Sequence, residues 1–514
     1  MQWFQKATFY HIYPLGYCGC EKEHTDSPAE QGRILKISQN AEYISSLGFT
    51  AVYLGPVFES DRHGYDTRDY TKIDSRLGSN DDFKAVCDAL HKNGIRVVVD
   101  GVFNHVGRGF WAFEDVRKNG LSSRYRDWFY IREGNNGYND GFYYEGWEGH
   151  YELVKLNLHN PEVKEYIKSC VTGWVRDFGI DGIRLDVAYC LDLQFLRELR
   201  GHCKWLKNDF WLMGETLHGD YNKWMNDEML DSVTNYECYK GIYSSFNSMN
   251  MFEISYSINR QFGSEHWCIY RGKHLYTFVD NHDVSRIATI LTCKEHIFGV
   301  YTLLYTMPGI PSVYYMSEFG EEGDKSQGDD ALRLPFERKQ DNAVTSHIRK
   351  LNNAYKQIPA LSMGDYRQLT VTNKQYAFSR SFEGSEAVIM INADSAPFTM
   401  NVGKGGMYTD ALSGEKCDLS GNITLGAFEC RIFSNTDVSL DEVKTAPVEV
   451  AETPIEAVHE TKTIAEEQPA EMPTEMLTVC LKKSTLEALT EKAKKQGMTA
   501  EEFCASLLSS ATEQ

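Results

Sequence analysis

The sequence lacks the features that mark a protein for a membrane or for export. No apolar run approaches the roughly twenty residues that a membrane-spanning helix requires. The opening segment MQWFQKATFYHIYP has no basic flank followed by an apolar stretch and a small-residue cleavage site, so we expect no secretory signal. Together these absences argue against membrane proteins and predict a cytoplasmic location.

Positive charge and paired cysteines are also scarce. The 514 residues contain 53 Lys and Arg against 73 Asp and Glu, a formal charge of -20 that nucleic acid and anionic membrane surfaces would repel. The thirteen cysteines are scattered singly apart from Cys18 and Cys20, with no second pair at ligand spacing. The pattern therefore predicts reduced thiols, no cysteine-bound metal and neutral substrates.

Short apolar runs alternate with amphipathic helical stretches through the first 360 or so residues. In DDFKAVCDALHKNG, for example, Phe83, Val86, Ala89 and Leu90 share one helical face and Gly94 ends the pattern. Eight strands with intervening helices predict an α/β fold, a closed parallel (β/α)8 barrel. The strand runs are ATFYHIYP, FTAVYLGPV, IRVVVDGVFNH, IDGIRLDVA, FWLMGET, DSVTNYE, LYTFVDNHD and IPSVYYM.

Two further domains are expected around the barrel, which we assign to residues 1–103 and 157–361. The third and fourth strands are separated by a long interval rich in Gly, Asn, Tyr and Trp, and this composition predicts a small inserted domain at 104–156. Period-two patterns such as EAVIMINAD then predict an all-β domain at 362–435.

The C-terminal part changes character twice. Residues 436–475 hold four prolines, no aromatic residue and eleven acids against two lysines, which predicts a disordered acidic linker. Residues 476–512 then read as one strand and two short capped helices, a pattern similar to the ribbon-helix-helix fold. Five lysines and six glutamates from residue 474 onward make nucleic acid an unlikely partner, so we expect the tail to form a homo-oligomer; a helical appendage without a partner is the alternative.

Charged and imidazole side chains collect where four of the predicted strands end. The C-terminal ends of barrel strands converge on one pocket, so these residues are expected to meet although they are far apart in sequence. Burying several uncompensated carboxylates costs several kcal/mol each, which a capped loop would not explain. The pattern therefore predicts a catalytic site built from Asp100, His105, Arg184, Asp186, Glu215, His282 and Asp283.

The segments DGVFNH, GIRLDVA, GET and FVDNHD, in this order, resemble the four signature segments of the α-amylase family of glycoside hydrolases. KLNLHNPEV and HGYDTRDYTKID are similar to further family segments, and the resemblance covers about residues 1–435. It implies a retaining hydrolase that cleaves α-1,4 bonds of neutral α-glucan oligosaccharides through a covalent glycosyl-enzyme intermediate.

The resemblance also implies roles for individual residues. Asp186 is the expected nucleophile, Glu215 the general acid and base, and Asp283 the carboxylate that holds sugar hydroxyls. Arg184, two residues before Asp186, is expected on the same side of the strand, where it keeps the nucleophile ionised. Two neighbouring anions are expected to make Glu215 retain its proton. The substrate-binding set implied is Tyr65, stacked on the sugar, with His63, His105, Arg184, His282 and Asp100.

HGYDTRDYTKID, AFEDVRKNGLSSRYRDWF and RLDVAYCLDLQFLRELR are similar to the cyclomaltodextrinase, neopullulanase and maltogenic amylase group. That group usually has Asn-Glu where this chain has Tyr189-Cys190, which leaves α-1,6 cleavage and transfer activity open. The preference between cyclic and linear substrates is open as well. A transferase or isomerase of the sucrose phosphorylase or trehalose synthase type is the enzymatic alternative. A barrel without catalysis that senses sugars is the non-enzymatic one.

No cofactor is expected to be required. Asn104 and the inserted domain could hold a structural calcium, as relatives often do, but no dense Asp cluster of calcium-loop spacing accompanies them. Some aromatic residues of the insert are expected to contact glucose units and the rest to form its core. The aromatic candidates are Trp111, Phe142, Tyr143, Tyr144 and Trp147.

Overall fold

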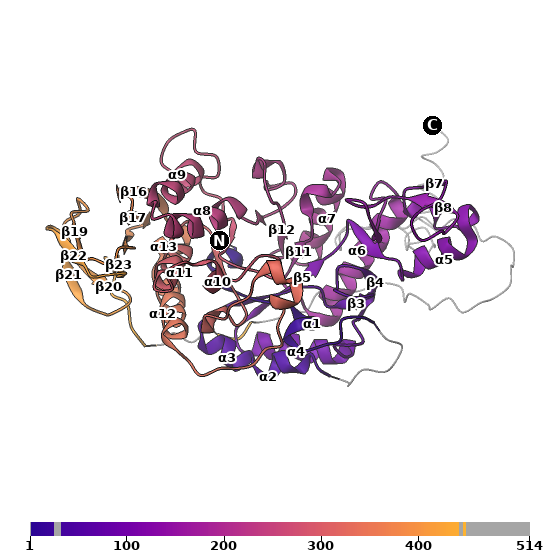
Figure 1. The fold of residues 1–514 in the computed structure, drawn as a ribbon, viewed down its shortest axis with the longest axis horizontal. Coiled ribbons are helices and arrows are strands. Elements are labelled where there is room, and N and C mark those ends of the chain that lie inside the picture. The colour runs from indigo at the N-terminus through magenta and orange to yellow at the C-terminus, as the bar shows by residue number, and fades with distance from the viewer. Residues whose placement is uncertain (1, 25–31, 442–445, 449–514) are drawn as a thin grey trace, which may run out of the picture. The chain divides into compact units, whose positions relative to one another are not determined.

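The computed structural model describes residues 2–24, 32–441 and 446–448. Its centre is a parallel sheet of eight strands in the order β13-β12-β11-β5-β2-β1-β15-β14 (Figure 1). A parallel bridge between Thr234 and Tyr276 joins the two outer strands, so the predicted barrel is confirmed. The strands are β1 (Phe9–Ile12), β2 (Ala51–Leu54), β5 (Arg96–Gly101), β11 (Gly182–Leu185), β12 (Trp211–Gly214), β13 (Ser232–Val233), β14 (Tyr276–Phe278) and β15 (Ile310–Tyr314).

Aromatic side chains fill the barrel near the N-terminal ends of its strands. Phe9 of β1 packs against Trp211 of β12 and Tyr276 of β14, with ring centroids 5.0 and 5.5 Å apart. Trp3 and Phe4 lie ahead of β1 and pack against Trp211 at 6.0 and 5.8 Å. This end of the barrel is therefore packed core, as expected for a barrel of eight strands.

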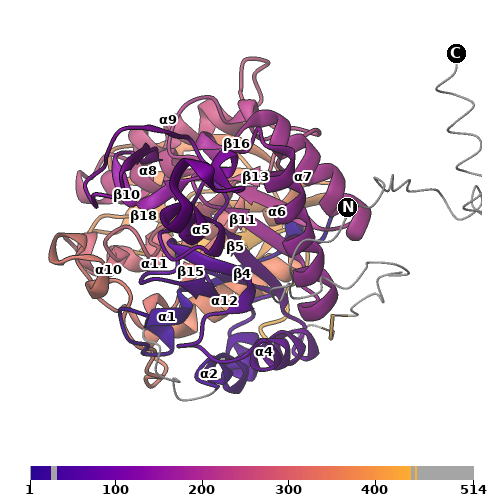
Figure 2. The same cartoon turned by 90° about the vertical axis from the view of Figure 1, so that its right-hand side faces the viewer.

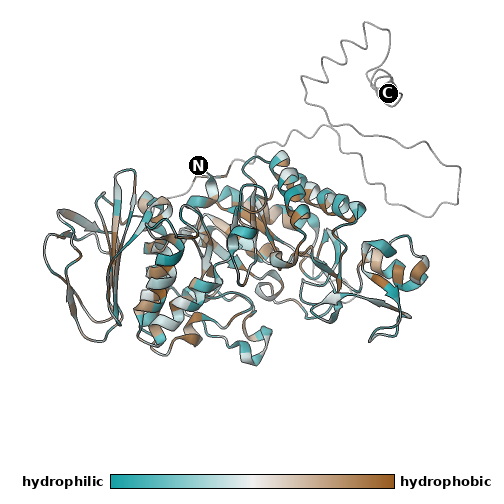
Figure 3. Ribbon diagram, turned by 90° about the horizontal axis from the view of Figure 1, so that it is seen from above, coloured by the Kyte–Doolittle hydropathy of each residue, from teal (hydrophilic) through white to brown (hydrophobic). Residues whose placement is uncertain are grey.

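Helices surround the strands, and Figure 2 shows α4, α6 and α7 outside the barrel. Hydrophobic and hydrophilic residues both occur along these helices, as amphipathic packing against a sheet requires (Figure 3). α4 starts with a capping box in which Ser79 and Asp82 bond each other's backbone N–H, and Gly94 follows its end at a φ of 74°. The helices are α1 (Pro14–Tyr17), α2 (Leu35–Gln39), α3 (Ala41–Ser46), α4 (Asn80–Lys92), α6 (Pro161–Gly173), α7 (Leu193–Leu206), α8 (Tyr236–Asn247), α9 (Met251–Phe262), α10 (Ile287–Ile290), α11 (His296–Thr306), α12 (Ala343–Gln357) and α13 (Pro359–Met363).

The long interval after β5 forms a separate small unit. Its three-stranded sheet has the order β6-β10-β9, and β7 pairs with β8. Phe113, Phe142 and Tyr144 pack together inside it, with Phe113 and Tyr144 ring centroids 4.9 Å apart. The elements are β6 (His105–Gly107), α5 (Trp111–Asn119), β7 (Ile131–Glu133), β8 (Phe142–Tyr144), β9 (Gly146–Trp147) and β10 (His150–Lys155).

A separate hairpin after β2, formed by β3 (Phe58–Ser60) and β4 (Thr67–Ile73), carries His63 and Tyr65 in its connection.

The residues after α13 form an antiparallel β domain, as predicted. Six strands pair in the order β16-β17-β18-β23-β20-β21, and β19 pairs with β22. They are β16 (Asp365–Val371), β17 (Gln375–Phe382), β18 (Ser385–Asn392), β19 (Phe398–Met400), β20 (Met407–Asp410), β21 (Lys416–Asp418), β22 (Ile423–Leu425) and β23 (Cys430–Ser434). The first residues assigned to the linker lie against the barrel, because the carbonyl of Ser439 accepts hydrogen bonds from Asn353 and Gln357 of α12.

Most of the predicted linker and the whole predicted tail, 476–512, lie outside the described residues. The tail's fold and its role in oligomerisation therefore stay predictions. Within the described ranges, no helix combines the length and the apolar character needed to cross a bilayer.

Replacing Trp211 by Ala should destabilise the barrel strongly. Trp211 is fully buried among aromatic rings, and removing a buried Trp costs about 3–5 kcal/mol of unfolding free energy. Trp205 on α7 is 71% exposed and provides the control, since Trp205→Ala should change stability by no more than about 0.5 kcal/mol. Urea unfolding followed by circular dichroism measures both. Equal losses in the two variants would contradict the packing described.

Candidate active site

A cavity of about 550 Å³ opens where the barrel strands end, and it contains all three predicted catalytic carboxylates, Asp186, Glu215 and Asp283. Residues from the barrel, the β3–β4 connection, the inserted unit and the segment after β15 share its wall. Besides the carboxylates, the lining comprises His63, Tyr65, His105, Trp147, His150, Glu152, Leu153, Val187, Tyr189, Leu217, Tyr236, Val284, Lys325, Asp329 and Arg333.

Arg184 on β11 contacts three carboxylates at once. In the strand register it lies between Asp100 of β5 and Met213 of β12, and Glu215 follows β12 directly. Its Nη1 donates to Asp186 Oδ1 at 2.7 Å and to Asp100 Oδ1 at 3.0 Å, while Nη2 pairs with Glu215 Oε2 at 2.9 Å. The guanidinium is almost wholly buried, and one cation therefore compensates acids from three neighbouring strands.

The turn after Asp186 also holds Glu215. Val187 has a φ of 38° and a ψ of 47°, a left-handed conformation that is rare for a β-branched residue. This conformation directs the Val187 N–H to Glu215 Oε2 at 3.1 Å. Tyr236, the first residue of α8, adds a longer contact from its hydroxyl to Glu215 Oε1 at 3.4 Å. The Val187 N–H, together with Arg184 and Tyr236, thus holds the Glu215 carboxylate next to Asp186.

The environment moves the pKa of Asp186 upward. Burial is the main cause, and the neighbouring Glu215 and Asp100 carboxylates add to it, whereas Arg184 acts in the opposite direction. Arg184 therefore stabilises the ionised form of Asp186, as expected, but does not outweigh burial and two like charges. A cluster of three acids and one cation in a dry site favours keeping one proton.

Asp283 has the opposite balance. Burial raises its pKa, but His282, Arg333 and Arg184 more than offset this, so the pKa lies well below its ordinary value. Its Oδ1 pairs with Arg333 Nη2 at 2.9 Å and its Oδ2 with His282 Nε2 at 2.9 Å. Asp283 is therefore held as an anion at the cavity wall.

A chain of hydrogen bonds lies directly under the cavity. Asp100 Oδ2 accepts from the Tyr53 hydroxyl at 2.8 Å and from the Tyr65 hydroxyl at 3.2 Å. The Tyr65 hydroxyl also contacts Nε2 of His282, and the two rings stack with centroids 5.6 Å apart. These contacts fix the Tyr65 ring at one side of the cavity.

His105 lines the cavity, but its ring nitrogens are buried. The side-chain amide of Asn104 lies 3.1 Å from His105 Nδ1, so Nδ1 accepts and Nε2 carries the proton. Burial, with a smaller contribution from His63, lowers the pKa of His105 to about 3, so the ring is neutral.

The predicted site residues divide into two layers. Asp186, Glu215, Asp283, Tyr65, His63 and His105 line the cavity. The other three, Asp100, Arg184 and His282, are buried and do not line it. Of the five aromatic candidates in the insert, Trp147 alone is among the lining residues.

Sequence reasoning missed several residues of the wall. Arg333, Asp329 and Lys325 lie in the segment between β15 and α12, where no strand or long helix provides a periodic signal. Tyr236 lies within the predicted strand run DSVTNYE, but in the structure it is the first residue of α8, after β13. Arg333 also pairs with Asp329 at 3.0 Å, so it links two acidic groups of the wall.

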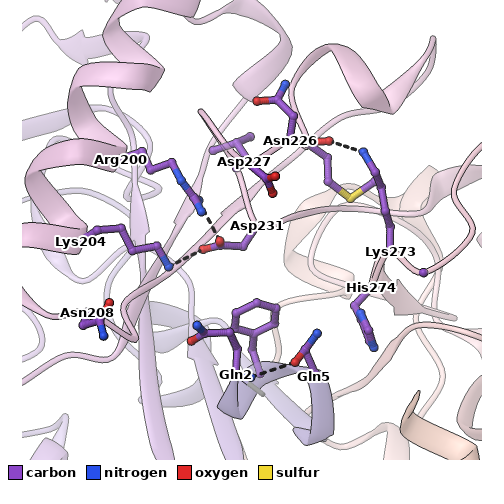
Figure 4. A pocket seen from close by; sticks show the side chains of 14 residues that line it. Gln2, Gln5, Arg200, Lys204, Asn208, Asn226, Asp227, Asp231, Lys273 and His274 are labelled. Atoms are coloured by element: carbon purple, nitrogen blue, oxygen red, sulfur yellow. Dashed lines mark hydrogen bonds and ion pairs between the residues drawn. The ribbon is translucent and has the colours of Figure 1, made fainter. Parts of the chain in front are cut away.

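A second cavity, of about 640 Å³, lies at the other end of the barrel (Figure 4). Its lining residues precede β1, β12, β13 and β14, which places it at the N-terminal strand ends. Its cations have partners: Arg200 and Lys204 pair with Asp231, and Lys273 donates to Asn222. This cavity lacks the three candidate catalytic acids, so the chemistry belongs to the first one.

Among the residues that the structure describes, no group of three or more His, Cys, Asp or Glu side chains is placed to hold a metal ion. Asn104, the residue considered for calcium, is buried, and its side-chain amide is engaged with His105.

Comparison with known proteins identifies the family. Residues 12–359 match the family model described as the alpha-amylase catalytic domain. The chain belongs to the α-amylase family. It is 30% identical over 436 residues to the cyclomaltodextrinase of Geobacillus thermopakistaniensis, covering 80% of this chain and 74% of that one. It is 29% identical over 445 residues to neopullulanase 2 of Thermoactinomyces vulgaris, covering 81% and 74%.

Solved structures agree with the sequence relatives. The ligand-free cyclic α-maltosyl-(1→6)-maltose hydrolase of Arthrobacter globiformis superposes with a TM-score of 0.74 at 27% identity, covering 85% of this chain and all of that one. As a member of the α-amylase family, the protein described here is a glycoside hydrolase that acts on α-glucans.

Asp186→Asn should stabilise the protein at neutral pH. A folded-state pKa above the unfolded value means that ionising Asp186 costs folding free energy; the cost is absent below the unfolded pKa and grows as pH rises through the folded one. Asn carries no titratable group, so we expect Asp186→Asn to be the more stable protein near pH 7 and to lose this advantage near pH 4.

Urea unfolding at both pH values measures this gain. Asp231→Asn is the control, because its carboxylate pairs with Arg200 and Lys204 at the opposite barrel end, and its loss should lower stability near pH 7. A gain from Asp186→Asn that did not vary with pH would contradict the electrostatic account.

Proposed function

We propose that this protein is a retaining hydrolase that cleaves α-1,4 bonds of maltodextrins or cyclodextrins through a covalent glycosyl-enzyme intermediate. The observation that carries the proposal is the placement of Asp186 and Glu215 on the two Nη atoms of one guanidinium, in one cavity. A shared cation keeps the two carboxyl groups close, as the separation of about 5 Å in a double displacement requires.

In the first step, an ionised oxygen of Asp186 bonds to the anomeric carbon while Glu215 passes a proton to the leaving glycosidic oxygen. Glu215 must carry the proton that it donates in this step, while Asp186 is ionised. The bound sugar lies between the two carboxyl groups. In the second step, the Glu215 carboxylate takes a proton from water, whose oxygen attacks the same carbon and releases Asp186. Two inversions retain the anomeric configuration.

The cavity wall supplies groups for holding the sugar. The anionic Asp283 accepts from sugar hydroxyls, and the neutral His105 ring lies on the same wall. Tyr65 offers a fixed aromatic face beside them. Arg333 adds further hydrogen-bond donors to this wall, and Asp329 adds acceptors.

Apolar side chains favour a glucose unit on the leaving-group side. Trp147 from β9, Tyr189 after β11 and Leu217 after β12 all line the cavity, near Val187. Sugar rings bind such surfaces through their C–H faces. The relatives named for cyclomaltodextrins, pullulan and a cyclic maltosyl-maltose make short or cyclic α-glucans the class we propose.

We also propose a cytoplasmic location and a mechanism without a cofactor. The eleven cysteines within the described ranges are all free thiols, which suits a reducing compartment. Asp186 supplies the nucleophile and Glu215 makes both proton transfers, so no step in the mechanism uses a metal ion.

Two variants should separate the catalytic roles. Asp186→Asn should lower kcat on the order of 10⁴-fold with every substrate, because no nucleophile is left. Glu215→Gln should be equally poor on maltoheptaose. With α-maltosyl fluoride, whose leaving group needs no proton, it should release about one fluoride per enzyme rapidly before the second step, which has lost its base, limits turnover. Glu322→Gln, an exposed surface change, is the control and should keep wild-type rates. Full activity of Asp186→Asn would reject the proposed nucleophile.

Substrate choice is tested with β-cyclodextrin, maltoheptaose, pullulan and starch in parallel. We expect the first two to react fastest and the products to appear first as α-anomers, as resolved by chromatography and NMR. Starch as the best substrate would contradict the proposed class. Maltotriose with and without phosphate tests the reaction itself, since a phosphate-dependent glucosyl phosphate product would indicate a transferase instead.

A further inference from the structure

Two buried histidine nitrogens inside the barrel have no hydrogen-bond partner among the described residues. They are Nε2 of His11, on β1, and Nδ1 of His282, after β14. The two rings lie close together, with centroids 5.1 Å apart and planes at 90°. An unpaired buried nitrogen costs about 1–3 kcal/mol, so two in one place call for a common explanation.

The proton position on His282 follows from its neighbours. Nε2 lies 2.9 Å from Asp283 Oδ2, and Asp283 is held ionised, so Nε2 must carry a proton to make this contact. The Tyr65 hydroxyl, also next to Nε2, can direct its own proton to Asp100. With its proton on Nε2, His282 leaves Nδ1 as a bare acceptor that needs a donor.

His11 is the neighbour that can supply this donor. It faces the barrel interior, with its ring stacked on Tyr53 at 4.3 Å and packed against Tyr314 at 4.9 Å. Burial, followed by the nearby His282 and Arg184, lowers its pKa well below the ordinary value, so the ring is neutral and has one N–H. His282 itself is enclosed between Tyr13 and Tyr65, so its ring cannot turn toward another partner easily.

We propose that His11 is a positioning residue whose Nε2–H donates to one buried water, which in turn donates to Nδ1 of His282. This chain holds the proton that His282 shares with Asp283 on Nε2. A buried water needs at least two polar partners, and the two nitrogens provide them. The proposal rests on the proposed hydrolase function, because the group being positioned faces Asp283.

The consequence concerns the cavity wall above. Nε2–H of His282 orients one oxygen of Asp283, while Arg333 orients the other. If Nδ1 lost its donor, His282 could exchange tautomers and leave Asp283 Oδ2 without a proton donor. Transition-state contacts to the sugar would then weaken, although His11 touches no substrate.

Replacing His11 tests the chain. His11→Phe keeps a ring on Tyr53 but removes the donor, and we expect kcat on maltoheptaose to fall about tenfold with KM nearly unchanged and with the melting temperature preserved. His11→Gln retains an N–H and should restore kcat to within about threefold of wild type. Tyr276→Phe, which removes a buried hydroxyl deeper in the barrel, is the control and should keep wild-type kcat. Equal kcat values for wild type and a folded His11→Phe would overturn the proposal.

A readout without turnover separates this inference from the proposed function. Ring ¹⁵N shifts of His282, assigned by its absence in His282→Gln, report which nitrogen carries the proton. We expect the Nε2–H pattern in wild type and in His11→Gln, and averaged shifts in His11→Phe. An unchanged Nε2–H pattern in His11→Phe would reject the role of His11. An inactive wild type with the expected shifts would instead reject the hydrolase function alone.

Discussion

The ion cluster around Arg184 is the interaction on which the rest of the site depends. One buried guanidinium meets acids from β5, β11 and the end of β12, at 2.7 to 3.0 Å. In a dry interior each of these acids alone would cost several kcal/mol, and the cation alone would cost as much. The register of three parallel strands places Arg184 and its acidic partners side by side. The pairing of the strands therefore also determines the geometry of the ion cluster. The barrel holds a charge-rich centre because its acids and its cation are fixed together.

The packed aromatic end of the barrel makes this cluster effective. Phe9, Trp211 and Tyr276 fill the interior below, so water reaches the acids from the cavity side. Charge interactions are stronger in such surroundings than in water. For this reason two aspartates of the same site have very different pKa values. Burial and like charges raise the pKa of Asp186, whereas His282, Arg333 and Arg184 lower the pKa of Asp283. The two environments suit a group that exchanges charge during the reaction and one that stays anionic.

Much of the fold and the positions of several candidate site residues could be predicted from the sequence. Eight apolar runs carry a periodic signal, and the polar residues that end them stand out, so the sequence places Asp186 and Glu215 at strand ends, where the structure has them in one cavity. Residues such as Arg333 were missed because a loop position depends on tertiary packing that leaves no pattern. The left-handed Val187 could not be expected either, since a β-branched residue argues against it. The sequence also does not show that Asp100 lies below the cavity wall. Its carboxylate is held there by contacts with Tyr53, Tyr65 and Arg184.

Chemistry and substrate choice are carried by different parts of the molecule. The acids proposed to react follow barrel strands, whose positions are fixed by backbone pairing and by the ion cluster. The groups proposed to meet the rest of a glucan chain, such as Trp147, Tyr189 and Arg333, come from the insert and from loops. Loop positions tolerate change without loss of the core. The chain is about 30% identical to its relatives. We therefore expect its loop and insert residues, and not its strand-end acids, to determine which α-glucans it prefers.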